Sequence, residues 1–229
     1  MNMGMYLSQN ARKVPEKLAI DCEGRQYNYD QFNREVNKLA HGLLDLGISK
    51  GDKVAFMMKN SDTFVFSYFA GAKIGAVIVP MNFRLTASEI QYILKQSEAK
   101  VVICDEDFEE TIVKAMVSSN VEKVIVVGTP SIAENRSYIE VLSSNEQEPN
   151  VEVLETDDLE ILYTSGTTGR PKGALFDHRR IFNVGLSMMI SMGINQQERF
   201  LHIAPLFHSA QLNLFLVSGT VLGATHFIH

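Results

Sequence analysis

The sequence is poor in the residues that mark several common protein classes. It has two cysteines, no tryptophan and six prolines among 229 residues. Two cysteines cannot form a disulfide framework, so a reducing compartment is expected. Lysine and arginine number 21 against 27 acidic side chains, and the net charge of −6 argues against binding to nucleic acid or anionic lipid. Because 45% of the residues are hydrophobic and 21% charged, the chain is expected to be globular rather than disordered.

Long apolar runs are also missing. The N-terminus has no stretch of signal-peptide length. The most apolar segment, 212–228, is shorter than the ~20 residues of a membrane-spanning helix and contains Asn213, Thr220 and His226. A buried helix followed by a strand is therefore expected there. The sequence predicts a cytoplasmic protein without a transmembrane segment, and it leaves peripheral membrane contact and oligomeric state open.

Short apolar runs alternate with segments of helical periodicity along the whole chain. Strands are predicted at 18–22, 26–29, 53–58, 77–79, 101–104, 124–127, 159–164 and 174–176. Helices are predicted at 32–44, 61–74, 86–96, 107–118 and 177–192. This alternation predicts an α/β fold of stacked, mostly parallel sheets with covering helices.

The composition changes at two places. Residues 144–158 carry six acidic and no basic side chains, which is typical of a solvated connection. We expect this stretch to join a first α/β subdomain, 1–143, to the start of a second, 159–229. Residues 200–229 contain no Asp, Glu, Lys or Arg. Because chain ends are usually polar and hydrated, this tail predicts a truncated second subdomain and a chain that is part of a longer protein.

The segment LYTSGTTGRPKG at 162–173 combines glycines, hydroxyl groups and two cations. Glycines let backbone N–H groups approach a ligand, hydroxyls bind phosphate oxygens, and Arg170 and Lys172 supply positive charge. A flexible surface turn would need fewer hydroxyls, so phosphate binding is predicted. The ordinary P-loop is excluded because Pro171 precedes the lysine and Gly173 follows it.

Three motifs carry a family resemblance. TSGTTGRPKG at 164–173 resembles the phosphate-binding signature of adenylate-forming enzymes, which include acyl-CoA synthetases, peptide-synthetase adenylation domains and luciferases. PMNFRL at 80–85 is similar to an acyl-CoA synthetase segment, and APLFH at 204–208 is similar to a second core motif of the family. The resemblance covers the whole chain and implies the large N-terminal domain of such an enzyme, incomplete here.

The resemblance implies ATP-dependent conversion of a carboxylic acid to an acyl-adenylate and then to a CoA thioester, with Mg²⁺ as the metal. It assigns catalytic roles to Lys172 and His208, a Mg²⁺-side role to Thr164, and a contact with CoA phosphates to Arg84. The implied nucleotide-binding residues are Thr164, Ser165, Gly166, Thr167, Thr168, Gly169 and Lys172. A core histidine and a solvated loop arginine are the alternative interpretations of His208 and Arg84.

The substrate and the catalytic competence of the chain stay open at this point. A medium- or long-chain fatty acid is favoured, because residues 200–229 offer no carboxylate to an amino-acid substrate. Aryl-acid ligases, peptide-synthetase adenylation domains and a non-catalytic ATP-binding module are the alternatives. Downstream family motifs are absent, so the chain alone is expected to be inactive. Zinc is not expected, because His226 and His229 would point to opposite faces of a strand.

Overall fold

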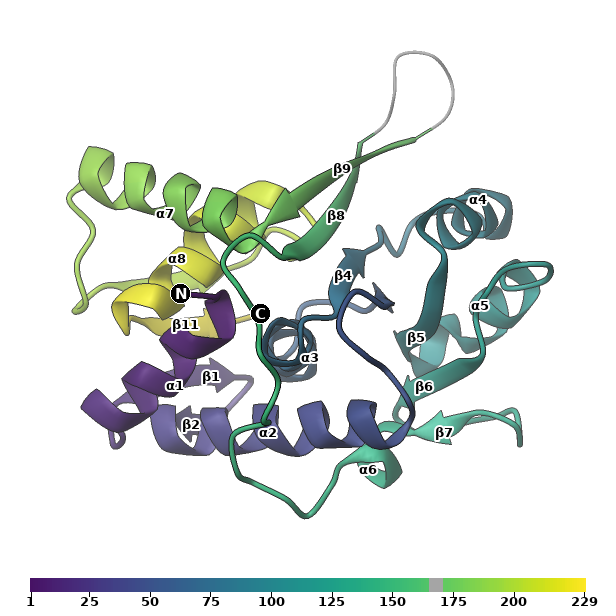
Figure 1. The fold of residues 1–229 in the computed structure, drawn as a ribbon, viewed down its shortest axis with the longest axis horizontal. Coiled ribbons are helices and arrows are strands. Elements are labelled where there is room, and N and C mark those ends of the chain that lie inside the picture. The colour runs from purple at the N-terminus through teal and green to yellow at the C-terminus, as the bar shows by residue number, and fades with distance from the viewer. Residues whose placement is uncertain (165–170) are drawn as a thin grey trace.

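The computed structural model describes residues 1–164 and 171–229, which form an α/β fold with two sheets (Figure 1). The strands are β1 (Leu18–Cys22), β2 (Arg25–Asn28), β3 (Lys53–Met57), β4 (Val77–Pro80), β5 (Ala99–Asp105), β6 (Lys123–Val127), β7 (Arg136–Ser137), β8 (Asp158–Thr164), β9 (Lys172–Asp177), β10 (Arg199–His202) and β11 (Thr225–Ile228). The helices are α1 (Met3–Lys13), α2 (Tyr29–Asp45), α3 (Asp62–Ile74), α4 (Ala87–Ser97), α5 (Glu109–Ala115), α6 (Tyr138–Val141), α7 (His178–Met192) and α8 (Ser218–Leu222), with a 3₁₀ turn η1 (Glu106–Phe108) and a π-helix η2 (Ala210–Val217).

The larger sheet has seven strands in the order β7-β6-β5-β3-β4-β8-β9, all parallel to their neighbours except β9, which runs antiparallel to β8. Its faces follow the two-residue period of a strand. Val54 and Phe56 of β3 belong to the cluster that contains α2 and α3, whereas Ala55 and Met57 belong to the cluster under α4 and α5. Both faces are therefore covered by helices, as the nearly continuous apolar strands predicted.

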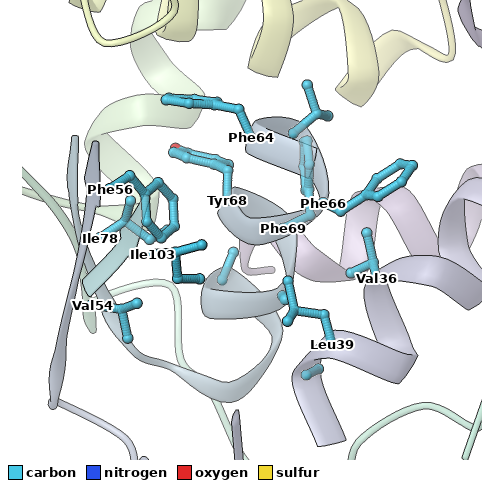
Figure 2. Packing of buried hydrophobic residues seen from close by; sticks show 14 of the residues in the cluster. Val36, Leu39, Val54, Phe56, Phe64, Phe66, Tyr68, Phe69, Ile78 and Ile103 are labelled. Atoms are coloured by element: carbon cyan, nitrogen blue, oxygen red, sulfur yellow. The ribbon is translucent and has the colours of Figure 1, made fainter. Parts of the chain in front are cut away.

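Helix α3 forms the centre of the larger cluster. Its residues from Phe64 to Ile74 are all buried, including Ser67 and Lys73, so it has no solvent-facing side. Figure 2 shows Phe64, Tyr68 and Phe69 of α3 packed between residues of β3 and β4 and residues of α2. The Ser61 side chain caps its first turn, and Gly75 ends it at a φ of 72°.

The smaller sheet has the order β10-β11-β1-β2 and joins early and late parts of the chain. The hairpin partners β1 and β2 are antiparallel, while β11 pairs in parallel with both β1 and β10. Helix α1 packs beside this region: the Asn10 amide donates to the Thr220 carbonyl at 2.6 Å, and the Met3 amide donates to His178 Nδ1 at 3.0 Å. Tertiary contacts therefore hold the first turns of the chain in place.

The α/β fold and most predicted elements are confirmed, with end shifts of a few residues. The capping box of Thr86 and Glu89 opens α4, and Asp177 caps α7. A buried helical segment followed by a strand is found at 210–228, although its first part is a π-helix. Four elements were not predicted: α1, α6, β7 and β10. In the described residues, no helix is both long enough and apolar enough to cross a bilayer.

The acidic stretch 144–158 lies in an irregular segment that crosses the surface before β8. Glu148 binds the buried Lys73 ammonium group at 2.6 Å, and Val153 is buried, so the segment is attached to the protein at defined points. Both sheets combine strands from before and after this stretch. The division into subdomains 1–143 and 159–229 stays a prediction.

Candidate functional site

The predicted phosphate-binding segment lies at the end of the β8–β9 hairpin. Thr164 and Lys172 are direct partners in its ladder, and both side chains are exposed. Ser165, Gly166, Thr167, Thr168 and Gly169, with Arg170, lie outside the described residues. The β8–β9 hairpin projects from the sheet edge, with Thr164 as the last residue of β8 and Lys172 as the first residue of β9 (Figure 1).

Packing at its base holds the hairpin in register. A Cβ on Gly173 would lie 2.8 Å from Ile161 and 3.1 Å from the ring of its partner Tyr163, so no larger residue fits without a shift. Ile161 and Tyr163 pack against the cluster under α4 and α5. Burial raises the pKa of Tyr163 to about 12. The glycine that follows Lys172 therefore has a packing role, and its φ is not in the left-handed region.

Sheet topology gathers the predicted motifs at one edge. After β4 the chain returns across β3 to β5, whereas after β8 it turns to β9 on the other side. The chain therefore leaves the carboxyl ends of the neighbouring strands β4 and β8 toward opposite sides of the sheet. Open α/β sheets bind ligands in the crevice outside such a pair of strand ends. The motif at 80–85 follows β4, and Thr164 ends β8.

The motif at 80–85 contacts the motif at 204–208. The Phe83 ring lies edge-on to Phe207 with centroids 5.3 Å apart, and it stacks on Phe108 at 5.9 Å. The exposed Arg84 guanidinium lies 5.7 Å from the centre of the Phe83 ring. This contact is a cation–π pair, which orients the arginine along the aromatic surface.

Asn60 fixes the 204–208 segment, and sequence reasoning missed it. It follows β3 at the same sheet edge, and its Oδ1 accepts from the Leu206 amide at 2.8 Å. Its Nδ2 lies within hydrogen-bond distance of the carbonyls of His202 and Ala204. A short polar residue between a buried strand and a helix cap was the available signal, because side chains at this position reach the carboxyl edge of the sheet.

His208 stands at the entry to η2. Its backbone N–H donates to the Pro205 carbonyl at 3.1 Å, and its own carbonyl accepts from Leu212 at 2.9 Å. The imidazole is exposed and lies 4.3 Å from the Phe207 ring, centre to centre. The imidazole is exposed in this chain, which does not match a buried core histidine, and the catalytic role of His208 stays a prediction.

A hollow of about 380 Å³ joins the 80–85 and 204–208 segments. It is lined by Lys59, Asn60, Phe83, Arg84 and Pro205, among others. Lys59 pairs with Asp107 at 2.6 Å and lies 5.7 Å from the Phe108 ring centre. Of the predicted site residues within the described ranges, Arg84 lines this hollow, whereas Thr164, Lys172 and His208 do not.

The buried cysteines and the remaining buried histidines have the surroundings of structural residues. Cys22 and Cys104 are buried free thiols, and burial raises the pKa of Cys104 to about 12, which makes it a poor nucleophile. His202 and His226 bond to each other at 2.9 Å. In residues 1–164 and 171–229, no three His, Cys, Asp or Glu side chains are grouped to hold a metal ion.

Comparisons with known proteins identify the family of the chain. The family model described as AMP-binding enzyme matches residues 7–229. The chain belongs to the AMP-binding enzyme family. AMP-binding enzymes at 31–35% identity include a long-chain-fatty-acid–CoA ligase, FadD13, of Mycobacterium tuberculosis (35% identical, covering 95% of this chain and 43% of the relative) and a feruloyl-CoA synthase of Amycolatopsis (31%, 99% and 44%).

Solved structures of the family share the fold. The inhibitor-bound N-terminal domain of FACL13 from Mycobacterium tuberculosis aligns with a TM-score of 0.90 at 34% identity, covering 99% of this chain and 56% of that one. The α/β architecture of this chain is thus that of the N-terminal domain of adenylate-forming enzymes. The chain spans less than half the length of the two curated relatives above.

Proposed function

We propose that the chain carries the phosphate-binding part of an ATP-dependent acid–CoA ligase. In the first step, a substrate carboxylate oxygen attacks the α-phosphorus of ATP, and the bond to pyrophosphate breaks. In the second, the thiol of CoA attacks the acyl carbon, and AMP leaves. The observation that carries the proposal is the β8–β9 hairpin, which presents Thr164 and Lys172 beside the place where the strand order of the sheet reverses. The match to the AMP-binding enzyme family supports it.

Charge stabilisation on the leaving pyrophosphate is the main requirement of the first step. The exposed Lys172 ammonium group is suited to neutralise the β- and γ-phosphates, and the Thr164 hydroxyl to donate to a phosphate oxygen. The predicted contacts from Ser165, Gly166, Thr167, Thr168 and Gly169 belong to the same proposal. Together these groups would hold the triphosphate at the sheet edge.

Among the described residues of the motif, the Thr164 hydroxyl is the oxygen that fits a Mg²⁺ ligand. Mg²⁺ prefers oxygen ligands and usually keeps several waters while it binds substrate phosphates. The exposed Thr164 hydroxyl, at the end of β8, supplies one neutral oxygen beside the proposed phosphate position. When bound, the ion would offset phosphate charge, and Thr164 is the residue of this chain that would hold it.

His208 and Arg84 are proposed to serve the other substrates. The exposed His208 ring at the start of η2 is placed to orient the acid carboxylate or to border the path of the thiol. Arg84 and Lys59 put two cations at the hollow beside the 204–208 segment, which suits the phosphates of CoA. A solvated loop arginine remains the alternative interpretation of Arg84.

A medium- or long-chain fatty acid is the favoured substrate. From Ala210 to Val217 the chain after His208 is apolar except for two amide side chains, Gln211 and Asn213, and residues 200–229 contain no carboxylate for an amino-acid ammonium group. The long-chain-fatty-acid ligase relative supports this choice. An aryl acid is the second candidate, supported by the feruloyl-CoA synthase relative. We also propose a reducing, cytoplasmic location, since both thiols are free.

The test is ATP–pyrophosphate exchange by the natural gene product against a panel of fatty and aryl acids. We expect exchange with fatty acids, and none from residues 1–229 alone. Exchange with aryl acids only would show that the substrate is an aryl acid and not a fatty acid. ATP binding with no exchange for any acid would favour a non-catalytic nucleotide-binding module, and exchange by residues 1–229 alone would show that the site is complete in this chain.

A further inference from the structure

The helix that follows His208 has an unusual shape and two polar residues. Its hydrogen bonding is that of a π-helix from Ala210 to Val217, a form that is rare and often occurs at functional sites. Gln211 and Asn213 are the polar side chains in an otherwise apolar run. Both bind buried groups on strands of the sheets, and the two strands belong to different sheets.

Asn213 binds Glu160 of β8 in the larger sheet. Its Nδ2 donates to Glu160 Oε1 at 2.6 Å, and the Tyr68 hydroxyl donates to Oε2 at 3.1 Å. Glu160 is completely buried, and Asn213 is 4% exposed. Burial raises the pKa of Glu160 to about 7, and the two hydrogen bonds oppose this rise. Tyr68 belongs to the central helix α3, among the side chains shown in Figure 2.

Gln211 binds His202 of β10 in the smaller sheet, at the start of a chain of hydrogen bonds. Thr220 Oγ1 donates to the Leu216 carbonyl, so it must accept from His226 Nε2. His226 Nδ1 then accepts from His202 Nε2, and His202 Nδ1 accepts from Gln211 Nε2. Every ring nitrogen is used when both imidazoles are neutral, and burial lowers the pKa of both, that of His202 to about 4.

These contacts give η2 defined links to both sheets immediately after His208. The link to Glu160 also reaches the phosphate-binding hairpin, because Glu160 is on the strand that ends at Thr164. We propose that Glu160 and Asn213 are positioning residues whose hydrogen bond sets His208 relative to the triphosphate-binding hairpin. This inference rests on the proposed function. A slip of η2 relative to β8 would move His208 from the reacting carboxylate, and misplacement of about 1 Å can lower a rate about 100-fold.

A purely structural role is the competing explanation, and paired variants separate the two. Glu160→Leu or Asn213→Leu alone leaves a buried polar group without its partner and should lower the Tm. The double variant Glu160→Leu/Asn213→Leu is made together with Tyr68→Phe, because the buried Tyr68 hydroxyl would otherwise lose its acceptor. In this triple variant all three polar partners are replaced by apolar groups of similar size, and most of the Tm should be recovered. Glu160→Gln keeps an acceptor for Asn213 and is the conservative rescue. Glu110→Leu, on an exposed carboxylate, is the control.

The experiment measures pyrophosphate exchange by the natural gene product, with the Kd for ATP and the Tm of each variant. We expect the triple variant to regain its Tm and bind ATP normally, yet to show a kcat about 10- to 100-fold below the wild type. Glu160→Gln should stay within about threefold, since the hydrogen bond persists. A triple variant with wild-type kcat would overturn the positioning role and leave the proposed function intact. A wild type that neither binds ATP nor exchanges pyrophosphate would overturn both.

Discussion

Lys73 shows how this fold accommodates a buried charge. Its ammonium group contacts Asn33 Oδ1 at 2.6 Å, Asn37 Oδ1 at 2.7 Å and Glu148 at 2.6 Å, which occupies all three of its donors. Burial lowers the pKa of Lys73 to about 8, although Glu148 opposes this effect. The residue therefore attaches the acidic stretch to the central helix.

We expect Lys73→Met to lower the free energy of unfolding by about 2–4 kcal/mol, because it removes the cation paired with Glu148 and the donor to the amide oxygens of Asn33 and the buried Asn37. Urea unfolding measures the change. Lys38→Met is the matched control: Lys38 pairs with Glu35 and Glu146 near the surface, and its loss should be below about 1 kcal/mol. Equal losses for the two variants would contradict the assigned role of Lys73.

Lys172→Ala tests the proposed phosphate contact of Lys172 directly. Its side chain is exposed, so we expect little change in Tm but a loss of about 1–3 kcal/mol in ATP binding or transition-state stabilisation, as for one charge-assisted contact. Nucleotide titration and pyrophosphate exchange measure it. Lys114→Ala, at an exposed pair with Glu110, is the control. Nucleotide affinity and rate that stay at the wild-type values would remove Lys172 from the site.

At the scale of elements, the close approach of the backbones of α2 and α6 limits which residue can occupy the contact position in α2. Gly42 of α2 faces α6, and a Cβ there would lie 1.9 Å from the Val141 carbonyl oxygen. A backbone oxygen cannot move as a flexible side chain can. The small residue therefore lets α6 and the segment after it lie directly on α2.

We expect Gly42→Ala to destabilise the protein by about 1–3 kcal/mol, although alanine is the better helix former, because the two elements must separate. Thermal unfolding gives the change. Ser187→Ala, on the exposed side of α7, should change stability by less than about 0.5 kcal/mol. A stabilised Gly42→Ala variant would show that α6 moves aside at little cost.

Elements whose signals are local could be predicted from the sequence. The capping box at Thr86 and the β-branched strands of the larger sheet depend on neighbouring residues only. Helix α1 was missed because tertiary contacts define it, such as Gly4 against Lys73 and Asn10 on the Thr220 carbonyl. Its weak apolar pattern has no strong signal of its own.

The residues of the candidate site also divide into those with a local sequence signal and those defined by tertiary contacts. Thr164, Lys172, Arg84 and His208 stand in contiguous motifs, so residue chemistry and resemblance could single them out. Glu160 and the pair of His202 and His226 could not be found, because their partners lie in segments distant in sequence. A lone buried polar residue gives no signal until the sheet order is known.

At the scale of the whole molecule, buried histidines link stability to pH. Burial lowers the pKa of His178 and His202 from 6.5 to about 4, and it also lowers that of His226 well below 6.5. Between about pH 6.5 and 4 the unfolded chain binds more protons at these sites than the folded one, so stability falls as the pH falls. Glu160, with its pKa raised to about 7, acts in the opposite direction from pH 7 to about 4.5.

Three histidines outweigh one carboxyl, so we expect a net loss of about 2–4 kcal/mol in unfolding free energy between pH 6.5 and 4.5. Urea unfolding at several pH values measures the slope. His178→Asn keeps an acceptor for the Met3 amide. It should reduce the slope between pH 5 and 6 by about 1.4 kcal/mol per pH unit, the effect of one proton. An unchanged slope in this variant would show that His178 is protonated in the folded protein.

The pairing of β1 with β11 also bears on how the protein forms in the cell. The Thr225 hydroxyl donates to the Leu18 carbonyl across 207 positions of sequence. Ribosomes add about 5–20 residues per second, so β1 waits roughly 10–40 s for its neighbour to be synthesised. During that time one side of the β1–β2 hairpin offers unpaired N–H and C=O groups to other chains. Nascent chains of this protein are therefore a natural substrate for chaperones that shield open strand edges.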